Sequence, residues 1–329
     1  MKIAINGFGR IGRPALKIAL EKGIEVTAIN DLAEVENLAY LLKYDSAYGN
    51  YNKSVETKEN KLVVDGKEIS VFSEKDPEKL PWKKLGVDVV LECTGFFTDR
   101  AGAGKHLKAG ARKVIISAPT KDESIKTIVL GVNDAEMNKE DDIIANASCT
   151  TNCLAPMMKV LDEVFGVEKS LMSTIHSYTS TQLLVDGPGG KDFRRGRAGA
   201  QNISPSSTGA AIATTLVMPN LKNKFDGMAF RVPTMVGSAS DLTVITKKET
   251  TVEDVNQAFE NSSKGFLKNI IQVTNEQLVS SDIVGNPHSA IIQTELTKVV
   301  GGNLVKVIGW YDNEWGYSNR MVELAQKIV

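Results

Sequence analysis

The sequence has no run of about 18 apolar residues, the length that a bilayer-spanning helix requires. Its first residues, MKIAINGFG, contain neither an apolar signal core nor a cleavage site. Cysteine is scarce: Cys93, Cys149 and Cys153 are an odd number without metal-ligand spacing, which favours reduced thiols over disulfides or a metal site. We therefore expect a cytoplasmic protein that binds neither a membrane nor a structural metal.

The chain also lacks a charge imbalance. Lys plus Arg number 39 and Asp plus Glu number 40, which argues against nucleic acid or an acidic membrane as the main partner. No internal repeat or low-complexity linker interrupts the 329 residues. A chain of this length and ordinary globular composition is expected to form two domains.

The first part of the chain alternates between strand and helix signals. Residues 2–6 form a β-prone run, a glycine-rich turn follows, 13–22 is a predicted helix and 25–30 a second strand. This order predicts a right-handed βαβ unit with parallel strands. Further parallel strands are predicted at 87–92, 113–117, 127–132 and 143–146. Asp65-Gly66, between 61–64 and 68–72, predicts a small antiparallel hairpin.

The pattern changes after Cys149. A helix predicted at 151–165 leads into β-prone stretches around 170–178, 227–234, 238–247, 270–273, 289–298 and 303–311. Few helices separate these stretches, which favours a largely antiparallel sheet. Helices are also predicted at 251–259, with Thr251 as N-cap, and at 318–328. We expect one domain formed by residues 1–148 with 312–329, and a second formed by 149–311.

The turn at residues 7–12 reads GFGRIG, directly after a strand and directly before a helix. In this motif Gly7 allows the tight turn, Gly9 lets the backbone approach a pyrophosphate, and Gly12 permits close packing of helix on strand. Asp31, at the end of the next strand, would accept hydrogen bonds from a ribose diol and repel a 2′-phosphate. The motif in this context predicts a Rossmann-type domain that binds NAD in preference to NADP.

Residues 148–152 read SCTTN at a junction between a strand and a helix. A cysteine near a helix N-terminus is favoured as thiolate, so Cys149 is the candidate nucleophile. Cys93 and Cys153 are interpreted as inert buried thiols. His176, in the polar strand STIHSYTS, is the candidate proton acceptor, although a strand histidine is more often structural. His106 is expected to be solvated on a charged helix.

Several longer segments carry a resemblance that extends from the first strand to the last helix. They are GFGRIG at 7–12, INDL at 29–32, LLKYDS at 41–46, SCTTNC at 148–153, IHSYT at 175–179, SSTGAA at 206–211, RVPT at 231–234 and WYDNEWGYSNR at 310–320. Together they resemble the glyceraldehyde-3-phosphate dehydrogenase family. The resemblance implies an α/β fold: a Rossmann-type parallel-sheet domain and an α+β catalytic domain with a mainly antiparallel sheet.

The resemblance also implies a function and a set of site residues. The expected reaction converts glyceraldehyde 3-phosphate, inorganic phosphate and NAD to 1,3-bisphosphoglycerate through a cysteine thioester, in a cytoplasmic homotetramer. Cys149 would be the nucleophile and His176 its base. The positions that match cofactor contacts are Gly7, Gly9, Arg10, Ile11, Gly12, Asp31, Lys75, Ser117 and Asn313. Those that match the two anion sites for substrate phosphate and inorganic phosphate are Ser148, Thr150, Thr179, Arg195, Thr208, Gly209 and Arg231.

Two of these positions depart from a uniform family pattern. Lys75 stands where many relatives carry Arg, and Arg195 is replaced in some of them. The alternatives are an erythrose-4-phosphate dehydrogenase on the same fold, a cysteine hydrolase built on Cys149 and His176, and a binding protein that has lost catalysis. The dinucleotide turn argues against the hydrolase, since a hydrolase needs no hydride acceptor, and the intact Cys149, His176 and Asn313 argue against the binding protein.

Overall fold

A computed structural model describes residues 1–329, which divide into two compact units. The first unit comprises residues 1–128, 135–147 and 318–329, and the second comprises 129–134 and 148–317. The second unit thus includes residues 129–134 and extends to residue 317. The assignment of residues 1–148 with 312–329 and of 149–311 to two domains stays a prediction.

The first unit is built on a nine-stranded sheet in the order β10-β11-β9-β8-β1-β2-β7-β6-β5. Its strands are β1 (Lys2–Asn6), β2 (Glu25–Asn30), β5 (Val55–Thr57), β6 (Lys61–Val64), β7 (Lys67–Phe72), β8 (Val89–Glu92), β9 (Lys113–Ile116), β10 (Lys126–Thr127) and β11 (Ile143–Ala145). Its helices are α1 (Gly12–Glu21), α2 (Val35–Lys43), α3 (Trp82–Leu85) and α4 (Arg100–Lys108), and β3 (Tyr44–Asp45) pairs with β4 (Gly49–Asn50). The strand predicted at 127–132 is wrong beyond Thr127.

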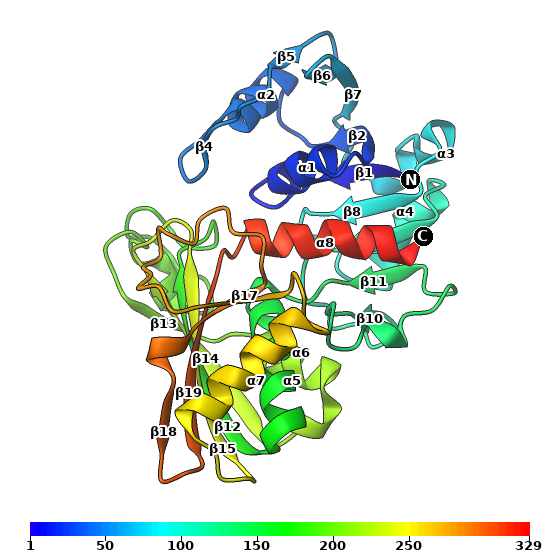
Figure 1. Ribbon diagram of the computed structural model, residues 1–329. Helices are drawn as coiled ribbons and strands as arrows, with labels where there is room; N and C mark the ends of the chain where they lie inside the picture. Colours follow the sequence, from blue (N-terminus) through cyan, green and yellow to red (C-terminus); the bar gives the residue numbers. More distant parts are fainter. The chain divides into compact units, whose positions relative to one another are not determined.

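The βαβ unit predicted at the start of the chain is confirmed. Strands β1 and β2 are parallel, and α1 lies against them in Figure 1. Leu16 and Ile18 of α1 are buried, as are Ile3 and Ile5 of β1, which is the arrangement that apolar strands covered by a helix require. Strand order reverses between β1 and β8, so the carboxyl ends of these strands form the switch point at which open α/β sheets bind ligands.

The glycine turn between β1 and α1 is fixed by backbone contacts. Gly7 has a φ of 92°, and a Cβ on it would lie 2.7 Å from the backbone nitrogen of Thr94. A Cβ on Gly12 would lie 2.1 Å from the carbonyl oxygen of Gly7. A Cβ on Gly9 would meet nothing within 4 Å. Gly7 and Gly12 are therefore required for packing, whereas Gly9 borders open space.

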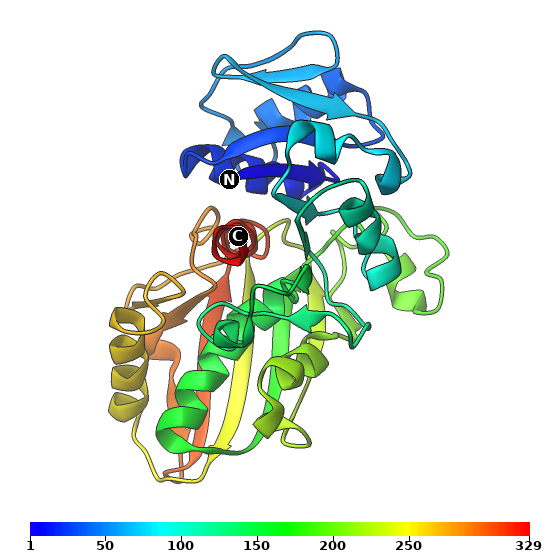
Figure 2. The ribbon, with the colours of Figure 1, turned by 90° about the vertical axis from the view of Figure 1, so that its right-hand side faces the viewer.

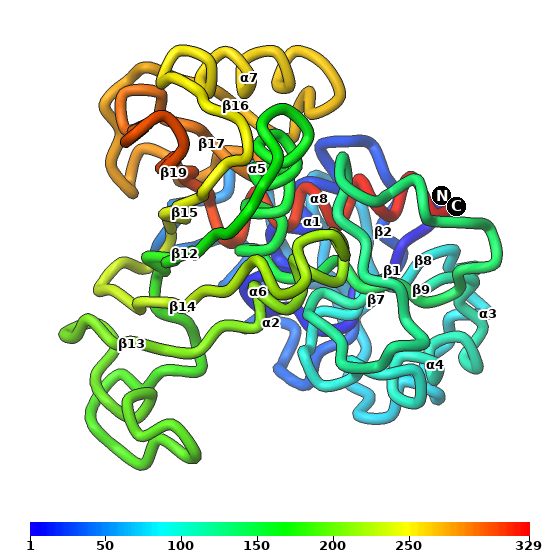
Figure 3. Tube along the Cα trace, turned by 90° about the horizontal axis from the view of Figure 1, so that it is seen from below, coloured from blue at the N-terminus to red at the C-terminus, as the bar shows by residue number.

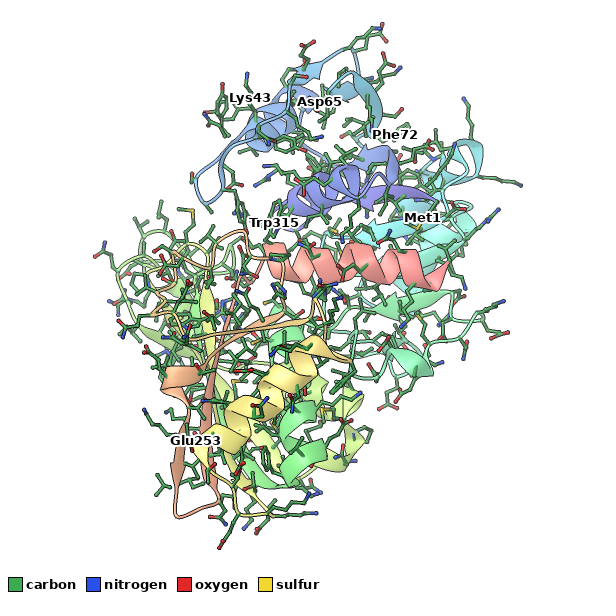
Figure 4. The ribbon with its side chains drawn as sticks, in the orientation of Figure 1. Met1, Lys43, Asp65, Phe72, Glu253 and Trp315 are labelled. Carbon is green, nitrogen blue, oxygen red and sulfur yellow. The ribbon has the colours of Figure 1, made fainter.

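The hairpin predicted around Asp65-Gly66 is confirmed. Strands β6 and β7 pair antiparallel, with Val64 opposite Lys67. Asp65 and Gly66 have φ angles of 47° and 75°, the left-handed conformations that a type I′ turn requires at both central positions. Figure 4 labels Asp65 near this turn and Phe72 at the far end of β7.

The second unit contains one mixed sheet of eight strands, seven of them in the order β13-β14-β12-β15-β19-β17-β16, while β18 pairs with β19 alone. Its strands are β12 (Val167–Ser177), β13 (Ser204–Ser206), β14 (Phe225–Val232), β15 (Ser238–Thr246), β16 (Ile271–Thr274), β17 (Ala290–Gln293), β18 (Lys298–Val300) and β19 (Leu304–Tyr311). Most neighbouring pairs are antiparallel, but β12 pairs parallel with β14 and β16 parallel with β17. The mainly antiparallel sheet expected for this part of the chain is therefore present.

Helices cover one face of that sheet. They are α5 (Cys149–Phe165), α6 (Ala210–Val217) and α7 (Val252–Lys264). The last helix, α8 (Trp315–Ile328), belongs to the first unit from residue 318 onward. Helix α5 contacts β12, β15 and β19, which lie side by side behind it in Figure 2, and Figure 3 shows α5 and α6 on the same side of these strands. The capping box predicted from Thr251 and Asp254 is confirmed at the start of α7.

No helix of the protein combines the length and the apolar character needed to cross a membrane. The prediction that His106 is solvated is wrong, because its side chain is completely buried within α4. The charged neighbours Lys105 and Lys108 suggested an exposed helix, whereas the ring of His106 points into the protein and bonds to Trp82 and Glu92.

Gly12 and Gly9 of the turn motif generate a test of this fold. We expect Gly12→Ala to lower the free energy of unfolding by about 1–3 kcal/mol, since its methyl group would overlap the Gly7 carbonyl. Gly9→Ala, with open space around the new methyl group, should unfold at the denaturant concentration of the wild type. Equal midpoints for both variants in urea, followed by circular dichroism, would contradict the turn geometry.

Candidate active site

Cys149 is the first residue of α5, directly after its N-cap Ser148. The Ser148 hydroxyl accepts a hydrogen bond from the backbone nitrogen of Thr151 at 3.0 Å, which satisfies one of the unpaired N–H groups of the first turn. The helix thus begins two residues before the predicted position, and Cys149 lies within its first turn. The sulfur is therefore held where the remaining N–H groups of the helix point.

His176, near the end of β12, is the ring nearest to this sulfur: Cys149 Sγ lies 3.4 Å from His176 Nε2. The proximity that sequence spacing alone could not establish is present in the structure. Strand pairing brings a third group to the site, because His176 on β12 is directly opposite Arg231 on the parallel strand β14. All three side chains belong to the second unit.

The other ring nitrogen of His176 has two neighbours of opposite character. Nδ1 lies 2.7 Å from the carbonyl oxygen of Ser177, which only accepts, and 2.6 Å from Nη1 of Arg231, which only donates. In one tautomer, Nδ1 carries the ring proton and donates a hydrogen bond to the Ser177 carbonyl. Nε2 is then unprotonated and can accept a proton from Cys149. With Arg231 donating to Nδ1, the ring proton instead lies on Nε2 and faces the sulfur.

Burial dominates the ionisation of this group of side chains. It raises the pKa of the Cys149 thiol, while Arg231, the Thr150 hydroxyl and the first N–H groups of α5 act in the opposite direction. Burial, together with the positive charge of Arg231, lowers the pKa of His176 to about 3, so the ring is neutral near neutral pH. The N–H groups at the helix start thus favour the thiolate, as expected, but desolvation has the larger effect and raises the pKa of Cys149.

Cys153 lies one helical turn after Cys149 but in a different environment. It is fully buried, its sulfur lies 3.8 Å from the sulfur of Met157, and burial raises its pKa to about 12. A thiol with this pKa is protonated at neutral pH and is a poor nucleophile. Burial also raises the pKa of Cys93. The two thiols interpreted as inert thus lie in environments that suppress their reactivity.

The residues predicted to bind two anions all lie in the second unit, but their hydroxyls differ in availability. Thr179 is paired with Thr181 at 2.9 Å, and the Thr208 hydroxyl accepts from the backbone nitrogen of Ala210 at the start of α6, where Gly209 is the N-cap. Arg195 lies 3.5 Å from the hydroxyl of Ser206. Thr150 is the least available of these residues, because its side chain is buried and its hydroxyl is hydrogen-bonded to Tyr311.

Tyr311 is a member of the site that the sequence did not single out. Its hydroxyl is hydrogen-bonded to Thr150 at 2.9 Å and to Thr174 at 2.8 Å, and its ring meets that of His176 edge-on at 6.0 Å. Burial raises the pKa of Tyr311, so the hydroxyl stays protonated. The residue stands in the conspicuous segment WYDNEWGYSNR, but nothing in its local pattern links it to His176.

Asn313 follows β19 and is held rigidly. Its Oδ1 accepts hydrogen bonds from the backbone nitrogen of Gly237 at 3.1 Å and from the hydroxyls of Ser177 and Ser238, each at 3.0 Å. Because a backbone N–H can only donate, the contact with Gly237 fixes which end of the amide is oxygen. The amide nitrogen of Asn313 is the end that remains as a hydrogen-bond donor.

In the first unit, a pocket of about 580 Å³ opens at the carboxyl ends of β1, β2 and β8. Among the predicted cofactor positions, Gly7, Gly9, Asp31 and Lys75 line it. The Asp31 carboxylate accepts from the backbone nitrogens of Phe8 at 2.7 Å and Ala33 at 3.1 Å, which hold it beside the turn. The open space over Gly9 and the acceptor at Asp31 fit a dinucleotide with a free ribose diol.

The remaining cofactor positions are not among the residues that line this pocket. Arg10 donates to Asp45 at 2.5 Å, and Ile11 is the residue before α1. Ser117 follows β9, and its backbone nitrogen bonds to the carbonyl of Glu92 at 2.9 Å. Their contribution to cofactor binding stays a prediction.

Known families and relatives match both units. The NAD-binding domain of glyceraldehyde 3-phosphate dehydrogenase matches residues 1–100, and the C-terminal domain of the same enzyme matches residues 148–313. The glyceraldehyde-3-phosphate dehydrogenase of Priestia megaterium is 54% identical over 331 residues, which cover 100% of this chain and 98% of the relative. That of Borreliella burgdorferi is 53% identical, and glyceraldehyde-3-phosphate dehydrogenase 1 of Kluyveromyces lactis is 50% identical, each over the full length of both chains.

The motifs quoted from the sequence, the fold of both units and these matches agree from one end of the chain to the other. The chain belongs to the glyceraldehyde-3-phosphate dehydrogenase family.

Proposed function

We propose that this protein is a glycolytic enzyme that oxidises glyceraldehyde 3-phosphate with NAD and phosphate to 1,3-bisphosphoglycerate. The observation that carries the proposal is the 3.4 Å contact between Cys149 Sγ and His176 Nε2 at the start of a helix. The same chain contains a dinucleotide turn. This favours an oxidation at Cys149 over a hydrolysis, because a cysteine hydrolase needs no hydride acceptor. Bound NAD supplies the hydride acceptor, held by the GFGRIG turn and Asp31.

In the first step, Cys149 Sγ attacks the aldehyde carbon. The carbon–sulfur bond forms, the carbonyl π electrons move to oxygen, and the thiol proton passes to His176 Nε2 while Nδ1–H donates to the Ser177 carbonyl. The new oxyanion receives hydrogen bonds from the Cys149 backbone N–H and from the protonated imidazole. Arg231, whose guanidinium lies beside His176, is placed to bind a phosphate of the substrate.

In the second step, the hemithioacetal is oxidised. The protonated His176 first gives its proton to the oxyanion, which forms the hemithioacetal hydroxyl. His176 then takes this proton back as the carbon loses hydride to the acceptor, which leaves a thioester on Cys149. General-base assistance of this kind is worth about 10²–10⁴ in rate. Inorganic phosphate then attacks the thioester carbon, the carbon–sulfur bond breaks, and the thiolate is regenerated with release of the acyl phosphate.

The anion-binding groups support phosphate rather than water as the acceptor of the acyl group. Thr208 and Gly209 lie at the start of α6, where backbone N–H groups are available to an anion. Arg195 and Thr179 add donors to the proposed pair of anion sites. Erythrose-4-phosphate dehydrogenase, the alternative on the same fold, is not favoured, because the family descriptions and the relatives are all of glyceraldehyde-3-phosphate dehydrogenase.

We further propose a cytoplasmic homotetramer. The face of the second sheet opposite α5 carries exposed apolar side chains, among them Leu171 and Met228, which are 66% and 48% exposed, and Ile175. A cavity of about 750 Å³ on this unit is lined in part by Leu171, Ile212 and Ile245. Exposed apolar patches of this kind mark association surfaces, so a second copy of the chain is the proposed partner of this face.

Replacement of the two cysteines of α5 tests the assignment of the nucleophile. We expect Cys149→Ser to abolish oxidation of glyceraldehyde 3-phosphate, since a hydroxyl in this site cannot form the sulfur nucleophile. Cys153→Ser should keep most of the activity, because its thiol is buried away from Nε2 of His176. The measurement is the formation of NADH, followed by absorbance, with and without phosphate or arsenate.

The same assay contains its controls. Retention of NAD binding by Cys149→Ser would show that the variant is folded. Wild-type turnover should depend on phosphate or arsenate, and turnover at the same rate without either would point to hydrolysis of the thioester. An active Cys149→Ser together with an inactive Cys153→Ser would reverse the assignment.

Asp31 generates a prediction on cofactor selection. The wild type should use NAD far better than NADP, because the carboxylate repels a 2′-phosphate. Asp31→Ala should weaken NAD binding through loss of hydrogen bonds worth about 1.5–3 kcal/mol each and relieve the penalty on NADP. Asp31→Asn, which removes the charge but keeps an acceptor for the Phe8 or Ala33 nitrogen, separates repulsion from turn stability. Equal kcat/KM for both cofactors in the wild type would contradict the placement of Asp31 beside the ribose.

A further inference from the structure

Three neighbouring strands of the first sheet end on buried polar side chains. Asn6 ends β1, Asn30 ends β2 and Glu92 ends β8, and they are 1%, 5% and 0% exposed. These strands adjoin one another at the switch point of the sheet. Buried polar groups at this density are costly unless each one is satisfied, so their hydrogen bonds can be followed one by one.

Glu92 is the acceptor on which four donors converge. Its Oε1 receives the backbone nitrogen of Thr94 at 2.8 Å and also the Thr94 hydroxyl. Its Oε2 receives Nδ2 of Asn6 at 2.5 Å and Nε2 of His106 at 3.0 Å. Both oxygens of this fully buried side chain are thus occupied.

The direction of each hydrogen bond is set by groups that cannot reverse. The Trp82 indole, a donor only, points at Nδ1 of His106 at 2.9 Å, so the ring proton lies on Nε2 and faces Glu92. On the other side, the backbone of Glu74 fixes the amide of Asn30 through its N–H and its carbonyl, each at 2.9 Å. Asn30 then donates to Oδ1 of Asn6 at 2.7 Å, which turns the Asn6 amide nitrogen toward Glu92.

This set of residues, called here the Glu92 network, consists of Asn6, Asn30, Trp82, Glu92, Thr94 and His106. Asn6, Asn30 and Thr94 line the pocket of about 580 Å³, whereas Trp82, Glu92 and His106 are not among its lining residues. The network also fixes the turn itself, since Gly7 follows Asn6 and its α-carbon packs against the backbone of Thr94. Glu92 is therefore hydrogen-bonded to two residues of the pocket lining, Asn6 and Thr94.

We propose that Glu92, oriented by His106 and Trp82, is a positioning residue for the dinucleotide. It holds Asn6 and Thr94 in the geometry that keeps the pocket open for the cofactor. The inference rests on the proposed function, since it assigns these residues to the binding of NAD. This role requires a side chain in which both terminal atoms accept hydrogen bonds, because Asn6, His106 and the backbone of Thr94 all donate to Glu92.

Glu92→Gln is the sharpest test, because it preserves shape and changes only hydrogen-bond polarity. In one orientation the new amide nitrogen faces Asn6 Nδ2 and His106 Nε2, and in the other it faces the Thr94 backbone N–H. We expect the Kd for NAD, measured by titration calorimetry, to rise about tenfold or more, as the loss of buried hydrogen-bond partners implies. Glu36→Gln, an exposed carboxylate on α2 of the same unit, is the matched control and should bind NAD as the wild type does.

Steady-state kinetics distinguish a role in cofactor positioning from a purely structural role, which would lower the activity without a selective effect on KM for NAD. For Glu92→Gln we expect KM for NAD to rise while kcat at saturating NAD stays within about twofold of the wild type and KM for glyceraldehyde 3-phosphate is unchanged. Alkylation of Cys149 without NAD should also be unchanged. A fall in kcat with constant KM for NAD, or an unchanged Kd, would overturn the proposal. A wild type that does not bind NAD would instead refute the proposed function.

A second pair of variants keeps the proposal testable if Glu92→Gln does not fold. Thr94→Val removes the hydroxyl that donates to Glu92 while keeping the shape of the side chain, and Thr94→Ser restores that donor. We expect Thr94→Val to weaken NAD binding by about threefold to tenfold and Thr94→Ser to lie near the wild type. Equal Kd values for Thr94→Val and the wild type would overturn the proposal.

Discussion

The contact between the sulfur of Cys149 and the imidazole of His176 is the constraint around which the second unit is arranged. It requires the first turn of α5 to lie against the end of β12, and the packing of α5 on β12, β15 and β19 maintains that position. The parallel pairing of β12 with β14 then adds Arg231 to the same place.

Burial disfavours the charged forms of Cys149 and His176, and neighbouring groups offset part of this effect. Burial raises the pKa of Cys149 and lowers that of His176, so both groups are held in their neutral forms. A neutral imidazole can accept the thiol proton, and the helix N–H groups and Arg231 favour the negative charge that then develops on sulfur or oxygen. The Tyr311 hydroxyl is hydrogen-bonded to both Thr150 and Thr174, so these three hydroxyl groups satisfy one another.

Short sequence patterns predicted the backbone conformation correctly where it depends on a few neighbouring residues. GFGRIG between a strand and a helix, Asp65-Gly66 between two β-prone runs, and Thr251 three residues before Asp254 each predict a backbone conformation that the structure contains. They succeed because the steric freedom of glycine and the reach of a capping side chain act over a few residues. The motif residues of both units were likewise recognisable from short segments.

The same patterns did not predict which side chains are buried by residues distant in the sequence. His106 was predicted to be solvated because its helix is charged, yet Trp82 and Glu92, distant in sequence, enclose it. The helix start was expected to favour the Cys149 thiolate, whereas burial, which depends on the whole fold, has the larger effect and raises the pKa of the thiol. The role of Tyr311 depends on Thr150 and Thr174, which a reader of the sequence has no reason to place together.

The central claim, that His176 accepts the proton of the Cys149 thiol, is tested most directly by the rate of Cys149 alkylation by iodoacetamide as a function of pH. The modified residue is identified by mass spectrometry, and the profile of the wild type is compared with that of His176→Asn. Because Nε2 shares the proton that the thiol gives up, loss of the imidazole should raise the pKa of Cys149 and move the profile to higher pH by about one unit or more. Superimposable profiles for the two proteins would contradict the account.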